Sequence, residues 1–178
     1  MNILGGWAFR IPIERVTSGV AVCDTNHGQV HAGNAYTFSK EISLGNGASV
    51  YFACRVPSTA YVHLQNLIAS FNQEFKLEFI EYDNNDGSPT PLSSINRHRG
   101  RANTSVVVIG EDEGEGTGTP LTLLTSVFAA GRGVTGLAED NIEWVLKGGY
   151  TYVLKITNQT ATAGTGSIKI DWYEETGS

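Results

Sequence analysis

The sequence predicts an all-β domain, an antiparallel two-sheet β-sandwich of jelly-roll type, preceded by an irregular N-terminal arm. From Ala35 onward, short segments carry apolar residues at every second position, and this period of two is typical of half-buried strands. Glycine, proline, asparagine and aspartate separate the segments, and apolar stripes of helical period are nearly absent. Eight or nine strands with long end loops favour a jelly roll over an immunoglobulin-like sandwich, whose Cys–Trp–Cys core is also missing.

Four strands are predicted in the first half of the domain. Their ranges are 35–43, 48–56, 61–71 and 74–82. The first two flank a Gly-Asn-Gly sequence, so we predict that they form a hairpin. The fourth alternates most regularly, and we expect Phe75, Leu77 and Phe79 to face the core while the charged residues between them face solvent.

The second half is less regular. A long interruption over 93–103 precedes a predicted strand over 104–110, and another strand is predicted over 121–129. Three closing strands lie within 142–175, where the apolar positions alternate again.

An acidic run opens the glycine-rich segment 111–120. It consists of Glu111, Asp112, Glu113 and Glu115. We predict a solvated loop there, because like charges and glycines neither pack nor pair. A calcium site is the less favoured interpretation, since the run lacks the alternating ligand ladder of an EF-hand loop.

Length and composition indicate one domain with a distinct arm. The chain has 178 residues, which is a common size for a single domain. We place the sandwich at 35–178 and the arm at 1–34. The arm carries apolar residues without sustained alternation, and we expect it to become ordered either on its own sandwich or on a neighbouring subunit.

Charge and hydropathy argue against nucleic acid and membranes as partners. The formal net charge is −6 and the isoelectric point is near 5.1, whereas a nucleic-acid partner selects for a basic face. No apolar run approaches the ~20 residues of a membrane-spanning helix. The first residues do not follow the pattern of a secretory signal, so we expect synthesis in a cytoplasm.

Histidines and cysteines are the first candidates for chemistry. His27 and His31 would face each other on a helix, but Gly28 and Gly33 work against a helix there, so we expect no metal site. His63 lies within a predicted strand and is expected to be packed or half-exposed.

Cys54 alternates in phase with Phe52 and Val56, and we expect it in the core rather than in a disulfide with Cys23. No converging set of acid, base, nucleophile or metal ligands can be named, so we expect neither an enzyme nor a cofactor.

The sequence NRHRGR is the one concentrated run of positive charge in this acidic chain. It contains Arg97, Arg99 and Arg101 around His98. Arginine forks suit carboxylates and phosphates, so this loop either docks on an acidic protein surface or is solvated.

The closing segment EWVLKGGYTYVLKITNQTATAGTGSIKIDWYEE, residues 143–175, resembles that of a group of tailed-bacteriophage virion proteins. HAGNAYTFSK, INRHRGRANTS and a glycine-rich stretch ahead of IEWVLK fit the same group. The likeness spans about Gly28 to Glu175. The chain departs from the group's pattern at Gly148 and Gly149, where a turn containing proline or asparagine is common.

The resemblance implies a capsid decoration (cement) protein, located on the virion surface and without catalytic residues. Its partners would be the major capsid protein and further copies of itself, as a dimer or trimer. We predict that the arm supplies contacts to capsid or sister subunits through Trp7, Phe9 and Ile11. The loop would add contacts through Arg97, Arg99 and Arg101.

A carbohydrate- or receptor-binding β-sandwich, as in a head fibre or tail tip, is the alternative. Such modules bind through exposed aromatic residues on a rigid sheet. Tyr51, Tyr61 and Tyr82 are the candidates for that platform.

Overall fold

The computed structural model describes residues 25–84, 90–112, 118–130 and 143–176. They form one short helix and eleven strands. In chain order these are α1 (Thr25–Ala32), β1 (Ala35–Leu44), β2 (Ser49–Arg55), β3 (Ala60–Phe71), β4 (Phe75–Tyr82), β5 (Thr90–Leu92), β6 (Ile95–Asn96), β7 (Val108–Asp112), β8 (Pro120–Phe128), β9 (Trp144–Leu146), β10 (Thr151–Asn158) and β11 (Gly164–Thr176). Within these residues no helix is long and apolar enough to cross a membrane.

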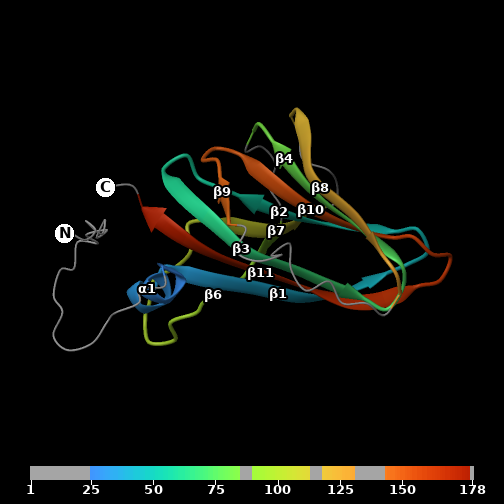
Figure 1. The fold of residues 1–178 in the computed structure, drawn as a ribbon, viewed down its shortest axis with the longest axis horizontal. Coiled ribbons are helices and arrows are strands. Elements are labelled where there is room, and N and C mark those ends of the chain that lie inside the picture. Colours follow the sequence, from blue (N-terminus) through green and yellow to red (C-terminus); the bar gives the residue numbers. More distant parts are fainter. Residues whose placement is uncertain (1–24, 85–89, 113–117, 131–142, 177–178) are drawn as a thin grey trace, which may run out of the picture.

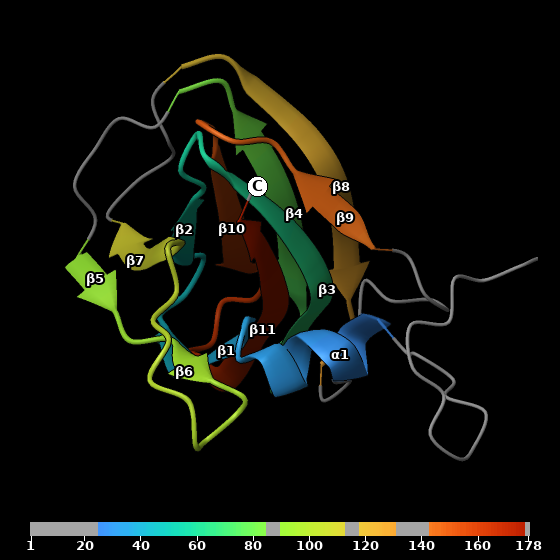
Figure 2. The same ribbon diagram turned by 90° about the vertical axis from the view of Figure 1, so that its left-hand side faces the viewer.

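The strands form two antiparallel sheets that face each other (Figures 1 and 2). One sheet has the order β6-β1-β11-β3-β9, and the other has the order β5-β7-β2-β10-β4-β8. The prediction of an all-β antiparallel sandwich is therefore confirmed.

The core lies between the sheets and is filled by the alternating side chains. Phe75, Leu77 and Phe79 are all buried, as their alternation predicts. Across the core, the rings of Phe38 on β1 and Phe52 on β2 lie 5.8 Å apart. Each fully buried side chain of this size contributes about 1.5–3 kcal/mol of transfer free energy, so this interior is the main source of stability.

The predicted hairpin between the first two strands is wrong. β1 pairs with β11 and β6, whereas β2 pairs with β10 and β7. The connection through Gly45 and Gly47 carries the chain from one sheet to the other. Alternation shows which face of a strand is apolar but not which strand lies beside it. Two consecutive strands show the same alternation whether they pair in a hairpin or lie in two facing sheets.

The prediction of an irregular arm up to residue 34 is wrong for its last part. Residues 25–32 form α1, despite the glycine at position 28. One interior glycine costs about 1 kcal/mol relative to alanine, and contacts of α1 with β1 and β11 are available to offset it. Residues 1–24, with Trp7, Phe9 and Ile11, lie outside the described residues.

The acidic run is only partly a loop. Glu111 and Asp112 continue β7, because the ladder with β2 extends to the pairs Phe52–Glu111 and Tyr51–Asp112. The Glu111 carboxylate forms an ion pair with Lys40 of the opposite sheet, which supplies the partner that the loop interpretation lacked. Glu113 and Glu115 lie outside the described residues.

Candidate interaction surface at one end of the sandwich

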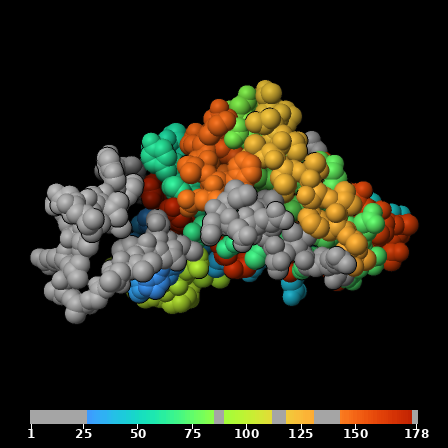
Figure 3. All heavy atoms as spheres, viewed as in Figure 1, coloured from blue at the N-terminus to red at the C-terminus, as the bar shows by residue number. Residues whose placement is uncertain are grey.

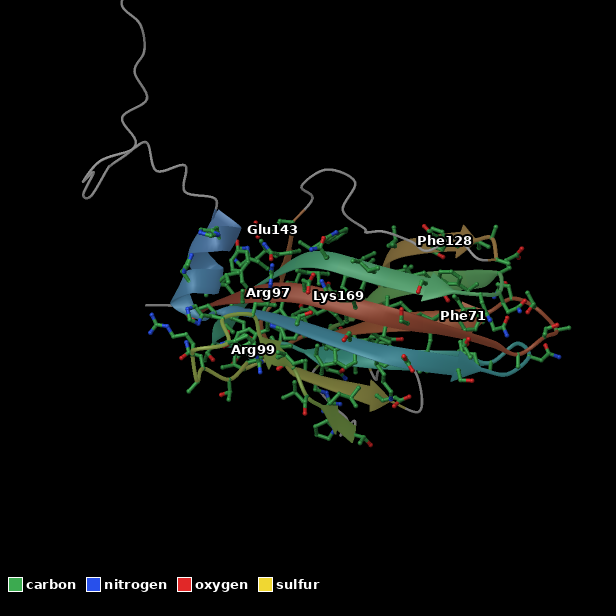
Figure 4. All side chains as sticks on the ribbon, turned by 90° about the horizontal axis from the view of Figure 1, so that it is seen from below. Phe71, Arg97, Arg99, Phe128, Glu143 and Lys169 are labelled. Atoms are coloured by element: carbon green, nitrogen blue, oxygen red, sulfur yellow. The ribbon has the colours of Figure 1, made fainter. Side chains whose placement is uncertain are left out.

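The structure places α1 and the loop from Arg97 to Arg101 together at one end of the sandwich (Figure 2). We call this surface the basic end. It comprises His27, His31, Arg97, His98, Arg99 and Arg101. Figure 4 shows Arg97 and Arg99 on the same end of the molecule as α1.

The end of α1 fixes one side of this surface. Gly33 follows the helix with a φ of +83°. Its N–H donates to the Val30 carbonyl and the Asn34 N–H donates to the Gln29 carbonyl, both at 3.0 Å, which is a Schellman motif. A Cβ atom at Gly33 would lie 2.9 Å from Cγ of Arg101. The absence of a side chain at Gly33 therefore leaves room for the aliphatic part of the Arg101 side chain.

Asn96 holds the other side, the arginine loop. Its Nδ2 donates to the carbonyls of Gly33 at 2.7 Å and Asn103 at 3.1 Å. Its Oδ1 accepts from the N–H of His98 at 2.8 Å, and the Arg97 N–H donates to the Ala35 carbonyl at 2.8 Å. The backbone of the loop is therefore anchored to the start of β1.

The three predicted arginines are exposed. Arg97 Nη1 donates to Oε1 of Gln65 at 3.3 Å. Within the described ranges, no ion pair is formed by Arg99 or Arg101. In a chain with a net charge of −6, this end presents exposed guanidinium groups, whose geometry suits carboxylates and phosphates.

Apolar side chains accompany the arginines. Ile95 on β6 is 47% exposed, and Val106, in the segment that leads to β7, is 43% exposed. Arginine is enriched at protein–protein interfaces relative to the rest of the protein surface.

A buried carboxylate ties the segment before β7 to the last strand. Glu174 on β11 accepts hydrogen bonds from the N–H groups of Val106 at 3.0 Å and Val107 at 3.3 Å. It also accepts from the Ser105 hydroxyl and from Nε1 of Trp172 at 2.9 Å. Because β11 and β7 belong to different sheets, these hydrogen bonds join the two layers.

A second buried carboxylate ties the neighbouring strands β4 and β10 to the turn that follows β9. Glu81 on β4 accepts from the Tyr152 hydroxyl at 2.8 Å and pairs with Lys147 Nζ at 2.7 Å. The same hydroxyl accepts from the Lys147 N–H at 2.7 Å. Burial first, together with the charge and hydrogen bond of Glu81, raises the pKa of Tyr152.

Sequence reasoning missed both glutamates, although a signal was present. Glu81 continues the inward phase of Phe79 on β4, and Glu174 continues that of Trp172 on β11. A charged residue in the inward phase of an otherwise apolar strand indicates a buried polar network.

His63 behaves as predicted. It lies on β3, and its side chain is 15% exposed and stacks on Tyr173 with ring centroids 4.3 Å apart. Its Nδ1 lies 3.3 Å from Glu143 and its Nε2 lies 3.7 Å from Glu175. Burial first, and then Glu143, raises the pKa of Tyr173.

The core position of Cys54 is confirmed. The residue is 7% exposed and its thiol is free. Burial, with a smaller contribution from the charge of Glu174, raises the pKa of this thiol to about 12. Cys54 is therefore an unreactive packing residue, and Cys23 lies outside the described residues.

The three tyrosines of the carbohydrate interpretation do not form one platform. Tyr61 is 60% exposed, but Tyr82 is only 2% exposed and Tyr51 is half-buried. Tyr82 faces outward from its sheet, yet it packs in a small cluster with Ala53 and Val153.

Among the described residues, no group of three or more histidine, cysteine, aspartate or glutamate side chains converges on a point that could hold a metal ion.

Comparison of the chain with models of known protein families, with curated proteins and with solved structures finds no match.

Proposed function

We propose that this chain is a non-enzymatic structural protein of a bacteriophage virion. In this role it decorates and cements the icosahedral capsid through contacts with the major capsid protein, after synthesis in the host cytoplasm. The resemblance of residues 28–175 to tailed-phage virion proteins supports the proposal. The observation that carries it is the convergence of the arginine loop and α1, the last part of the predicted arm, at one end of the sandwich.

We also propose that the sandwich is a jelly roll. Strands β1, β11, β3 and β9 face β2, β10, β4 and β8, and chain connections pass repeatedly from one sheet to the other. This order supports two interlocked Greek keys, the jelly-roll arrangement. β5, β6 and β7 are then additions at one edge of each sheet.

The chemistry of the basic end fits a capsid surface that displays carboxylates. Exposed ion pairs contribute only about 0–1 kcal/mol each, so one copy would bind weakly through Arg99 alone. Ile95 and Val106 add apolar burial. An oligomer that binds several sites on the shell at once repeats these weak contacts, and its overall affinity for the shell is then much higher than that of one copy.

Self-association is supported by the edge strand β8. It pairs only with β4 among the described strands, and it lies on the surface in Figure 3. Leu121 and Val127 on this strand are 55% and 60% exposed. An unpaired edge with exposed apolar groups favours edge-to-edge pairing with a second copy.

Electron cryomicroscopy of the particle assembled with this chain tests the proposal. We expect density for the sandwich on the shell, with the basic end turned toward the capsid protein. Absence of the chain from the shell would overturn the proposal. A rise in melting temperature with a glycan, without binding to the shell, would instead favour the carbohydrate-binding alternative.

A matched pair of variants tests the orientation. Arg99→Gln removes one positive charge at the basic end, and Ala161→Glu adds one negative charge in the exposed β10–β11 loop at the far end of the sandwich (Figure 1). Both lower the net charge by one. We expect Arg99→Gln, and not Ala161→Glu, to lower capsid occupancy.

Deletion of residues 1–26 tests the arm. It should lower the occupancy of the protein on the capsid and the heat resistance of the particle, and unchanged values would remove the arm from the proposal.

A further inference from the structure

We infer that His27 and His31 form a binding site for a divalent transition-metal ion that prefers cis imidazole ligands, such as Ni²⁺ or Cu²⁺. The inference rests on the geometry of α1 and is independent of the proposed capsid role. The two histidines are four residues apart on the helix, so both rings project from the same face.

The two nitrogen atoms are close enough for both to bind one metal ion. Nε2 of His27 and Nε2 of His31 lie 3.0 Å apart. With metal–nitrogen bonds of about 2.1 Å, that separation corresponds to an N–M–N angle of about 90°. Tetrahedral coordination would require the nitrogens to separate to about 3.4 Å. The pair as it stands therefore matches adjacent positions of a square-planar or octahedral ion, the geometry of Cu²⁺ and Ni²⁺.

The exposure of the pair suits an ion that keeps its remaining ligands as water. Both histidines are exposed and their rings meet at 77°, with centroids 4.4 Å apart. Metal binding replaces the hydrogen bond between the two rings. Both Nε2 atoms then need a free lone pair for the metal, so the proton of each ring must be on Nδ1. Imidazole nitrogen selects these ions over Mg²⁺ or Ca²⁺, which prefer oxygen.

His98 is a neighbour of this site and not a ligand in it. Its ring centroid lies 6.3 Å from that of His31. Its Nδ1 accepts a hydrogen bond from the Gly100 N–H at 3.2 Å. In the neutral ring the proton then resides on Nε2, which leaves no lone pair there for a metal. The structure therefore assigns two protein ligands to the site.

Titration calorimetry with Ni²⁺ on the tag-free full chain tests the inference, because a purification tag of histidines would bind the same ion. We expect His27→Ala and His31→Ala each to weaken binding at least about tenfold. His98→Ala should retain the affinity of the unmodified chain within about twofold. His27 and His31 are exposed and His98 is half-buried. Melting temperatures without metal should be measured for all three variants, which separates loss of a ligand from loss of folding.

Spectroscopy provides a second readout. The paramagnetic resonance spectrum of bound Cu²⁺ should show coupling to two equatorial nitrogens in the unmodified chain and to one in His31→Ala. Equal Ni²⁺ affinity in the unmodified chain and in His27→Ala or His31→Ala would overturn the inference. An equal loss in His98→Ala would overturn the assignment of two ligands.

Discussion

The Glu174 carboxylate on β11 accepts a hydrogen bond from the backbone N–H of Val106, 3.0 Å away, and thereby joins the two sheets of the sandwich. Glu174 is 4% exposed, and its carboxylate also accepts hydrogen bonds from Ser105, Val107 and Trp172. Removal of one member of such a network leaves the others buried without partners.

Glu174→Ala is expected to lower the free energy of unfolding by about 3 kcal/mol, because the Val106 N–H and the indole N–H of Trp172 lose their acceptor. The Val107 N–H keeps the Ser105 hydroxyl oxygen as a second acceptor. Urea denaturation measures the change. The neighbouring Glu175 is exposed, so Glu175→Ala is the control and should stay within about 0.5 kcal/mol. Equal effects of the two substitutions would show that the buried network is not stabilising.

Tyr152→Phe is expected to lower the free energy of unfolding by about 1–2 kcal/mol. The substitution removes the hydroxyl that donates to Glu81 and accepts from the Lys147 N–H, while the ring still fills its place. Tyr61→Phe removes the same atom from a side chain that is 60% exposed and should leave the denaturation midpoint unchanged. A neutral result for both would contradict the role of the hydroxyl.

Cys54 should make the fold less stable in alkali. Its pKa is raised from 9.0 to about 12, so between these values the unfolded thiol has lost its proton while the folded thiol retains it. The unfolded state then binds fewer protons, and the free energy of unfolding falls by about 1.4 kcal/mol per pH unit in this window. Urea denaturation should show a total loss of about 1.4 kcal/mol between pH 8 and pH 10, most of it above pH 9, and Cys54→Ala should lack this loss. An identical slope in Cys54→Ala would assign the effect to other groups.

Two glycine substitutions around α1 should have opposite signs. Gly33→Ala forces a side chain into a backbone with a φ of +83° and should cost about 1–2 kcal/mol. Gly28→Ala lies within α1, where an added Cβ meets nothing within 4 Å, and should stabilise the helix by up to about 1 kcal/mol. Hydrogen exchange of the α1 amides measures both effects. Slower exchange in Gly33→Ala would contradict the assigned helix end.

The strands could be predicted from the sequence because buried apolar residues alternate with exposed polar residues along them. β4 is the clearest case, since Phe75, Leu77 and Phe79 face the core as expected. Partnership between strands could not be predicted in this way. β1 and β2 are adjacent in the chain, but each pairs with one strand more than 90 residues later, β11 and β10 respectively, and no local pattern encodes such pairings.

The helix α1 was missed because Gly28 outweighed the signal at its other end. Gly33 followed by Asn34 is a typical helix stop, and the structure uses it as such. The arginine loop was identified from its charge alone. Its position beside α1 depends on Asn96, whose side-chain hydrogen bonds to Gly33 and Asn103 only the folded structure reveals.

The central place of β11 has a consequence for synthesis of the protein. β1 and β3 both pair with β11 along their length, and until it leaves the ribosome their other neighbours are the two-residue β6 and the three-residue β9. The nascent chain must therefore carry two long, apolar, unpaired strands until residues 164–176 emerge. Exposed edges of this kind aggregate, so a ribosome that stalls before Gly164 would release a chain prone to precipitate rather than a smaller working domain.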